Sequence, residues 1–535
     1  MWEKNISGLT PNANEGVGPH FRVKEAGLLL AKGHSPHQEK VRVELAYTYY
    51  IYIRRSLWSG SIFDSSDRDT LTMHDKKTRE DGASHLDMLN GPIAIKMVWF
   101  ALPVAGTAFL QQLLNAADVA VVGRFASSTA LAAVGANAFI INLMINLFVG
   151  LSVGANVVIA RLLGERDEER VSRAVHTSIA VSLLSGVLLA VVGWLGAEDI
   201  LSWLHTPQGI MPLAVLYFRI YFLGMPFLML MNFAAAILRS KGDTRRPLFV
   251  MAASGVVNVL LNLFFVIRLH MSVEGVAIAT LVSSVLSSFM LVRILCREHG
   301  MLRLDLRKVR IHWDVLRSIA VIGIPAGVQG MLFNFSNVLI QGGINSLGAT
   351  AIAANTVSLN YDYFCFFVAN AFAQAGTSFL SQNHGARLYR RCRRVIRDTI
   401  LLGAGGTMVV SFLFVLFAAP LSSLFTSDAD VIRLSVERIA IVLTFYTVHS
   451  CNETISGLLR ALGHSLTPTL VCVVFICGVR LFWLYRVFPT NPTLGFLSCC
   501  YPVSWVVNAT VLFCVFFWIL KKKRPLSPRD VAGAA

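Results

Sequence analysis

Twelve apolar stretches follow one another from about residue 93 onward, and each is long enough to cross a bilayer as a helix. They predict an all-α membrane protein, because a lipid-embedded backbone must satisfy its own polar groups. The first six predicted spans are 95–123, 130–160, 174–196, 212–238, 247–267 and 273–294. The second six are 316–345, 350–382, 396–418, 432–459, 468–488 and 494–520. The composition agrees with this class, since 55% of the residues are hydrophobic and 15% are charged.

The twelve spans form two related halves. Short motifs recur at an offset of 221 or 222 residues: Pro103 with Pro325, Gly164-Glu165-Arg166 with Gly385-Ala386-Arg387, and Leu238-Arg239 with Leu459-Arg460. Each half contains six spans, an even number, so both halves insert in the same orientation. We therefore expect two pseudo-symmetric six-helix bundles, 91–310 and 311–522, related by an axis along the membrane normal. Transporters of this kind bind substrate in the cleft between the bundles.

The two ends of the chain differ from this membrane-embedded part. Residues 1–90 carry 12 Lys and Arg against 12 Asp and Glu, and they contain no membrane span. No apolar segment follows a basic start, so a signal peptide is not expected there. We expect residues 1–90 to be a polar extension that is disordered or dispensable. Residues 523–535 are expected to form a cytoplasmic tail.

The formal net charge of +16 lies entirely after residue 90. Clusters of Lys and Arg follow the second, fourth, sixth, eighth and twelfth spans, whereas the intervening loops carry isolated arginines such as Arg124 and Arg268. This asymmetry predicts that both termini lie in the cytoplasm. It also accounts for the positive charge without a nucleic-acid partner. The expected partners are membrane lipids and small organic cations, and the expected state is a monomer.

One buried carboxylate stands out in the first half. Asp118 lies deep in the first span, where a charge is costly and is by default a functional-site hypothesis. Its possible neighbours are Asn258 and Asn262 on the fifth span, four residues apart and therefore on one helical face, and Thr280 on the sixth. These oxygens are suited to a small hard cation, but the carboxylate could instead load and release a proton. Pro103, in the same span, is the predicted hinge.

Two further acids fall within spans of the second half, Asp362 and Glu453. Asp362 is surrounded by aromatic residues, an arrangement that favours an organic cation through charge pairing and cation–π contact. We therefore predict substrate binding by Asp362 and Glu453, together with Tyr361 and Gln112. By contrast, Arg239 and Arg460 are interpreted as cytoplasmic anchors.

The sequence offers no enzyme signature. It contains neither a GxxxxGK[ST] phosphate-binding loop nor an HExxH zinc motif, so neither ATP drive nor metal-dependent hydrolysis is expected from this chain. A membrane-embedded enzyme would need a cluster of catalytic groups at one depth. The clear histidines within spans, His176 and His449, belong to different halves.

Three stretches resemble the multidrug and toxic compound extrusion family, particularly its bacterial branch. They are LPVAGTAFLQQLLNAADVAVVGRF, IGIPAGVQGMLFNFSNVLIQGGINSLG and GLLRALGHSLTPTLVCVVFICGVRLFWLYRVFP, and the resemblance covers about residues 90–522. It implies 12 helices in two lobes, located in the bacterial cytoplasmic membrane. It also implies an antiporter that exports amphipathic organic cations, coupled to inward flow of H⁺ or Na⁺, with no other cofactor.

The resemblance is incomplete at the coupling site. Members with a cation site in the first lobe combine an Asp on the first span with Asn-xxx-Asp on the fifth and Thr on the sixth. Here Asn262 replaces the second acid of the fifth span, which removes one negative charge. Other members place a Glu on the seventh span, but Phe333-Asn334-Phe335 provides no acid there. The alternative function is a lipid-linked oligosaccharide flippase of related architecture, for which a more cationic cavity is expected.

Overall fold

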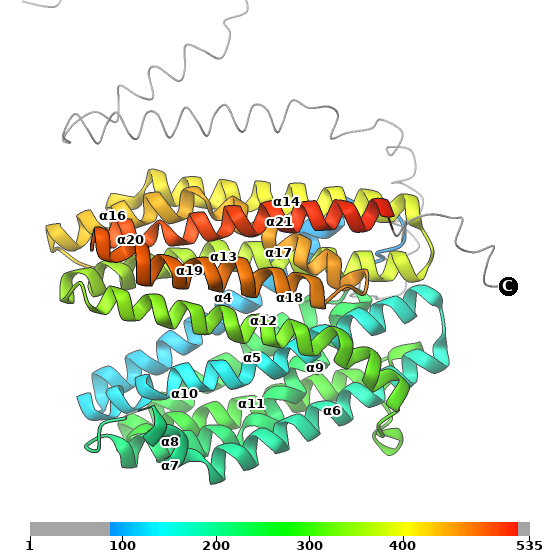
Figure 1. Ribbon diagram of the computed structural model, residues 1–535. Helices are drawn as coiled ribbons and strands as arrows, with labels where there is room; N and C mark the ends of the chain where they lie inside the picture. The colour runs from blue at the N-terminus through cyan, green and yellow to red at the C-terminus, as the bar shows by residue number, and fades with distance from the viewer. Residues whose placement is uncertain (1–85, 205, 523–535) are drawn as a thin grey trace, which may run out of the picture. The chain divides into compact units, whose positions relative to one another are not determined.

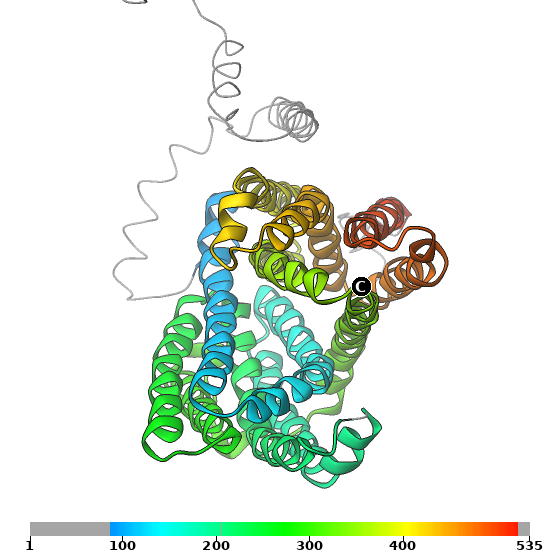
Figure 2. The ribbon, with the colours of Figure 1, turned by 90° about the vertical axis from the view of Figure 1, so that its left-hand side faces the viewer.

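The computed structural model describes residues 86–204 and 206–522, all of whose regular structure is helical. The predictions for residues 1–85 and for the tail 523–535 lie outside the described residues. In Figure 1 the helices run roughly parallel to one another, and in the end-on view of Figure 2 those of the two halves gather on opposite sides.

The first half contains six consecutive transmembrane elements (Figure 1). They are α4 (Ile93–Phe125), α5 (Ser128–Glu165), α6 (Glu168–Leu195), the pair α8 (Met211–Leu223) and α9 (Met225–Lys241), α10 (Arg245–Leu263) continued by the π-helix η2 (Phe264–Arg268), and α11 (Val273–Arg297). A short helix, α7 (Ala197–Trp203), connects α6 to α8.

The second half repeats this order after two single 3₁₀ turns, η3 (Gly300–Leu302) and η4 (Leu306–Lys308). Its long elements are α12 (Trp313–Asn345), α13 (Ala349–Gly385), α14 (Tyr389–Leu416), the pair α16 (Ala429–Thr444) and α17 (Tyr446–Ala461), the broken element from α18 (Leu466–Cys472) through η5 (Val473–Cys477), α19 (Gly478–Phe482) and η6 (Trp483–Val487), and α21 (Cys500–Lys522). Three short helices complete it: α15 (Ala418–Ser423), η7 (Phe488–Thr490) and α20 (Leu494–Ser498).

Within the described ranges, 10 helices are long and apolar enough to cross a membrane, and the pair α8–α9, bent by 44°, makes an eleventh if it is one span. The remaining predicted span, 432–459, corresponds to α16 and α17. Its low hydropathy has a simple cause, because it carries Arg433, Glu437, Arg438, Glu453 and Arg460. All 12 predicted spans therefore correspond to helical elements of the structure.

Both halves break the fourth element at the same place. Gly224 ends α8 just before Pro226, the second residue of α9. Phe445, 221 positions later, separates α16 from α17. A proline in the first turn of a helix lacks only an amide that would be unsatisfied there anyway. The common break shows that the repeat seen in the sequence extends to the backbone.

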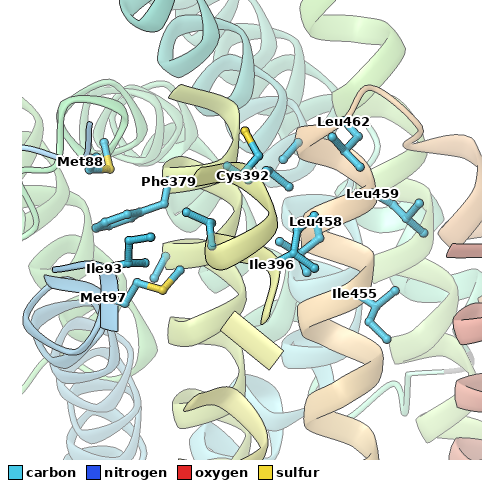
Figure 3. Packing of buried hydrophobic residues seen from close by; sticks show 14 of the residues in the cluster. Met88, Ile93, Met97, Phe379, Cys392, Ile396, Ile455, Leu458, Leu459 and Leu462 are labelled. Atoms are coloured by element: carbon cyan, nitrogen blue, oxygen red, sulfur yellow. The ribbon is translucent and has the colours of Figure 1, made fainter. Parts of the chain in front are cut away.

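The first helix of each half connects the two bundles. The start of α4 packs against the second-half helices α13 and α14, and its Ile93 and Met97 belong to the same buried cluster as Phe379 and Ile455 (Figure 3). Its end packs in a first-half cluster through Val121 and Val122. Similarly, α12 begins in a first-half cluster through Ile319 and ends in a second-half cluster through Ile344. The proposed boundary between the bundles therefore divides the sequence into its two repeats, but helices of both halves pack together across it.

Residues 86–90, which the sequence places in the polar extension, belong to the packed structure. Met88 is 1% exposed and lies in the cluster drawn in Figure 3. Its carbonyl oxygen accepts a hydrogen bond from Nδ2 of Asn383 on α13, at 3.0 Å. Arg391 on α14 donates to the carbonyl oxygens of Asn90 and Gly91 at 3.0 and 2.9 Å. The packed chain thus begins before the first membrane span.

Small residues bring the two halves into close contact along α5 and α12. A Cβ at Gly150 or Gly154 of α5 would collide with the backbone of α12 at Gly327 or Ile319. The same holds where α5 meets α13, because a Cβ at Gly385 would collide with the carbonyl of Arg161. Glycine at these positions allows the backbone contact that drives helix association in membranes.

Candidate functional site

Asp118 lies at the centre of a polar cluster in the first half. Asn262 of α10 donates a hydrogen bond from Nδ2 to one carboxylate oxygen, and Thr280 of α11 donates from Oγ1 to the other at 3.3 Å. Asn262 also donates to Oδ1 of Asn258 at 3.3 Å. The four residues predicted to form the coupling site, Asp118, Asn258, Asn262 and Thr280, are therefore brought together from three helices.

The side chains that donate hydrogen bonds to the Asp118 carboxylate are neutral. The described members of the cluster carry one negative charge, that of Asp118, with no cationic side chain among them. The titratable groups that interact electrostatically with Asp118 are Tyr217 and Tyr221 of α8. Oδ1 of Asn262 is buried without a hydrogen-bond partner in the described structure. A carboxylate in this setting can gain or lose a proton without breaking an ion pair.

A second site is a cavity of about 260 Å³ between the two halves. Helices α4, α5, α9, α10 and α11 of the first half line it, together with α13 and α17 of the second. Its charged lining residues are Arg239, Glu453 and Arg460. A concave site of this size, apolar with a few polar groups, is suited to a small organic molecule or part of a larger one.

The repeat explains which residues line the cavity. Several lining positions correspond by the offset of 221: Val149 with Asn370, Val153 with Gln374, Asn156 with Thr377, Asn232 with Glu453, and Arg239 with Arg460. Equivalent residues of the two halves thus lie on opposite walls. The walls differ in polarity, because Asn370, Gln374 and Glu453 of the second half take the places of Val149, Val153 and Asn232.

The second-half acid Asp362 is in a different situation. Its Oδ2 forms an ion pair of 2.8 Å with Nη2 of Arg438, whose side chain is fully buried while that of Asp362 is 13% exposed. Another buried arginine, Arg480, donates to Oδ1 of Asn337 at 2.8 Å and lies over the ring of Tyr501, as does Arg438. Asp362 is therefore the counter-ion of a buried guanidinium and does not line the cavity.

The remaining predicted substrate residues divide in the same way. Glu453 lines the cavity, whereas Gln112 does not; its neighbour Gln111 does. Tyr361 donates a hydrogen bond to the carbonyl of Leu421 at 2.8 Å and packs in the cluster around Asp362's helix rather than at the cavity. A helical rotation of 100° per residue separates Gln111 from Gln112, and sequence alone does not say which one faces inward.

The sequence interpretation of Arg239 and Arg460 as cytoplasmic anchors does not match the structure, which places both in the cavity wall. A signal was present in the sequence. Arg460 follows Glu453 by seven residues, two helical turns, so both lie on the same face of one helix. Arg239 stands in the same relation to Asn232.

The predicted hinge Pro103 lies inside α4, which continues without interruption through it. Its carbonyl accepts a hydrogen bond of 2.8 Å from Oγ1 of Thr107. Pro103 lies between the part of α4 that packs on the second half and the part that holds Asp118. The residue is therefore placed where a bend would change the relation between those two parts.

Two repeated helical halves around a charged cavity are the architecture of many secondary transporters. The chain belongs to the MatE family of MATE transporters, whose sequence profile matches residues 103–264 and again 325–485. The two matches begin at Pro103 and Pro325 and therefore reproduce the internal repeat. Members of the family are ion-coupled antiporters.

Known proteins agree with this assignment. The chain is 26% identical over 439 residues to the probable multidrug resistance protein YoeA of Bacillus subtilis, covering 80% of this chain and 94% of the relative. It is 26% identical over 391 residues to the probable multidrug resistance protein NorM of Thermotoga maritima, covering 72% and 84%. A solved structure described as an outward-facing conformation of a multidrug resistance MATE family transporter superposes with a TM-score of 0.75 at 22% identity, covering 81% of this chain and 96% of that one. The fold prediction is confirmed.

Proposed function

We propose that this protein is a proton-coupled antiporter that exports small amphipathic organic compounds across the bacterial cytoplasmic membrane, with both termini in the cytoplasm. The relatives described as multidrug resistance proteins support export of organic compounds. The cavity between the halves supports binding of molecules of that size. The distribution of Lys and Arg supports the orientation.

The observation that carries the coupling proposal is the set of groups around Asp118. Na⁺ needs several oxygen ligands, and a second carboxylate would help to strip its water. Here Asn262 presents its NH₂ group to the carboxylate, and Thr280 donates its hydroxyl proton. These donors stabilise a bare carboxylate and do not share a metal ion with it. The arrangement favours H⁺ over Na⁺ as the coupling ion.

The position of α4 suggests how protonation of Asp118 changes the substrate cavity. One end of α4 packs on the second half, its middle lines the cavity through Val104, Thr107 and Gln111, and its far end carries Asp118. Neutralising Asp118 weakens its hydrogen bonds with Asn262 and Thr280, which hold α4 against α10 and α11. In this proposal α4 then bends at Pro103 and reshapes the cavity that it lines.

Glu453 is the proposed counter-charge for the cationic part of a substrate, because it is the acid of the second half that lines the cavity. Asp362 is not proposed for this role, since Arg438 already neutralises it. The closed backbone contacts of Gly150 with α12 and of Gly385 with α5 lie toward the proposed cytoplasmic ends of these helices. They support an arrangement that is sealed on the cytoplasmic side, one of the states that alternating access requires.

A flippase for lipid-linked oligosaccharides is the second candidate, because Arg239 and Arg460 make the cavity more cationic than the sequence interpretation allowed. The cavity volume of about 260 Å³ is small for an oligosaccharide and favours a drug-sized molecule.

Efflux of a fluorescent organic cation from proteoliposomes, under separately imposed H⁺ and Na⁺ gradients, tests the proposal. We expect efflux with the H⁺ gradient and none with Na⁺ alone when pH is clamped on both sides. Asp118→Asn should abolish the H⁺-driven component, whereas Asp199→Asn, the same change at an exposed position of α7, should not. Efflux driven by Na⁺ alone would overturn the coupling assignment.

A further inference from the structure

Two equivalent arginines, one from each half, line the same cavity. Arg239 is in the last turn of α9, Arg460 is in the last turn of α17, and the offset of 221 relates them. We propose that these two arginines bind a carboxylate of the transported molecule, so that the preferred substrates carry a negative group as well as an apolar body. This inference rests on the proposed function, because it names the chemistry of the same cavity.

Neither guanidinium is in direct contact with a carboxylate of the described structure. Within the described ranges 86–204 and 206–522, neither Arg239 nor Arg460 forms an ion pair. Arg460 donates from Nη2 to Oε1 of Gln329 at 2.9 Å, and its Nε is buried without a partner. No described side chain or carbonyl accepts a hydrogen bond from Arg239. Buried guanidinium groups with unused N–H donors are costly unless an acceptor is supplied.

Glu453, seven residues before Arg460 on α17, interacts electrostatically with Arg460 but forms no ion pair with it. The cavity therefore holds two positive charges and one negative charge, which leaves one positive charge without a counter-ion. A substrate with one carboxylate brings this total to zero. A purely cationic substrate would raise it to two positive charges in a water-poor site.

The geometry of a guanidinium also favours a carboxylate. Its planar set of N–H donors matches the two oxygens of a carboxylate, whereas a compact ammonium would act only as a point charge. On the facing wall, Gln374 donates to Oδ1 of Asn370 at 2.5 Å. The arginines are the cationic donors of the cavity wall.

The two walls then orient the rest of the molecule. Apolar side chains from the first half line the cavity opposite the polar wall: Val149, Val153, Met231, Met251 and Leu291. An apolar ring system would pack on this wall, with its carboxylate directed toward Arg239 and Arg460. Any cationic group on the same molecule would be directed toward Glu453.

Rhodamine 110 and rhodamine 123 provide a matched pair of probes, because they share one cationic ring system and differ in a free carboxylate against its methyl ester. Fluorescence anisotropy of each, with the purified full chain in detergent and no ion gradient, gives the ratio of the two dissociation constants. We expect the parent protein to bind rhodamine 110 about tenfold more tightly, the preference of one charge-assisted contact. Equal binding, or tighter binding of rhodamine 123, would overturn the proposal.

Variants assign the preference to the two arginines. Arg239→Gln and Arg460→Gln should each bring the ratio close to one. Arg293→Gln removes the same charge from an exposed position of α11 outside the cavity and should leave the ratio unchanged. Should a glutamine variant fail to fold, Arg239→Lys and Arg460→Lys keep the charge but lose the planar donors, and should lower the ratio severalfold. An unchanged ratio in all folded cavity variants would contradict the assignment.

The outcome is separable from that of the coupling proposal. The ratio is measured without a gradient and therefore does not depend on which ion drives efflux. If H⁺ fails to drive efflux while the ratio depends on Arg239 and Arg460, only the coupling proposal fails. If H⁺ drives efflux but the two probes bind equally well, only the carboxylate proposal fails.

Discussion

The two halves of the repeat bury a carboxylate in opposite ways. In the first half, Asp118 contacts the neutral donors Asn262 and Thr280. In the second half, Asp362 is paired at 2.8 Å with the fully buried guanidinium of Arg438. One acid is free to change its charge, whereas the other must stay ionised to neutralise its partner. In the proposed function, the duplicated fold thus separates a titrating acid from a structural one.

Breaking the ion pair should have the largest effect on stability. Asp362→Asn leaves the guanidinium of Arg438 buried without a counter-ion, next to Arg480, and should destabilise the protein by about 3–5 kcal/mol. Thermal unfolding of the purified protein in detergent measures this loss. The double variant Asp362→Asn with Arg438→Gln removes both charges and should unfold at a higher temperature than Asp362→Asn alone. A single variant as stable as the parent would show that the pair is not structural.

The equivalent change in the first half should affect transport and not stability. Asp118→Asn keeps the size of the side chain and breaks no ion pair, so its free energy of unfolding should stay within about 1 kcal/mol of the parent. H⁺-driven efflux in proteoliposomes should fall by about a hundredfold or more, because the variant cannot carry a proton. Substrate binding without a gradient should be largely retained. Loss of folding instead would remove the contrast between the two acids.

Adding a charge beside Asp118 should change the ion specificity of the first half. Asn262→Asp places a second carboxylate next to the first, which supplies the negative charge and oxygen ligands that favour Na⁺. We expect Na⁺ to stimulate efflux by the variant severalfold at constant pH, with no such effect in the parent. Asn258→Asp is the matched control one helical turn away. Identical Na⁺ responses in all three proteins would argue against the neutral donors as the determinant.

A carboxylate outside the membrane provides the smallest contrast. Glu298, just after α11, is paired with Lys241 and Arg246. Burial alone would raise the pKa of Glu298, but the hydrogen bonds from Lys241 and Arg246 outweigh it and hold that pKa below its usual range. The pair therefore stabilises the fold fully above the unfolded-state pKa of about 4.3, and this contribution is lost as the pH falls through the lower folded-state value.

Thermal unfolding against pH measures the contribution of Glu298. Glu298→Gln should cost about 1 kcal/mol at neutral pH, and the difference from the parent should disappear in strong acid. A difference that persists there would mean that shape and not charge accounts for it.

Much of this protein was predictable from its sequence. The 12 spans follow from apolar segments that must satisfy their own backbone hydrogen bonds in lipid, which is a local requirement. The repeat follows from the recurrence of Pro103 as Pro325 and of Arg239 as Arg460. The polar cluster around Asp118 was also predictable, because Asn258 and Asn262 share one helical face and a carboxylate buried in a span needs polar neighbours.

Only the tertiary structure decided which charges meet. Asp362 and Arg438 are 76 residues apart and pair because α13 and α16 pack together, and no local pattern in either helix records that contact. The same reason places Arg239 and Arg460 in one cavity and turns Gln111, not Gln112, toward it. Hydrophobicity determines that a helix crosses the membrane, but not its rotation or its neighbours. Those depend on close packing between distant segments, such as the glycine contacts of α5 with α12.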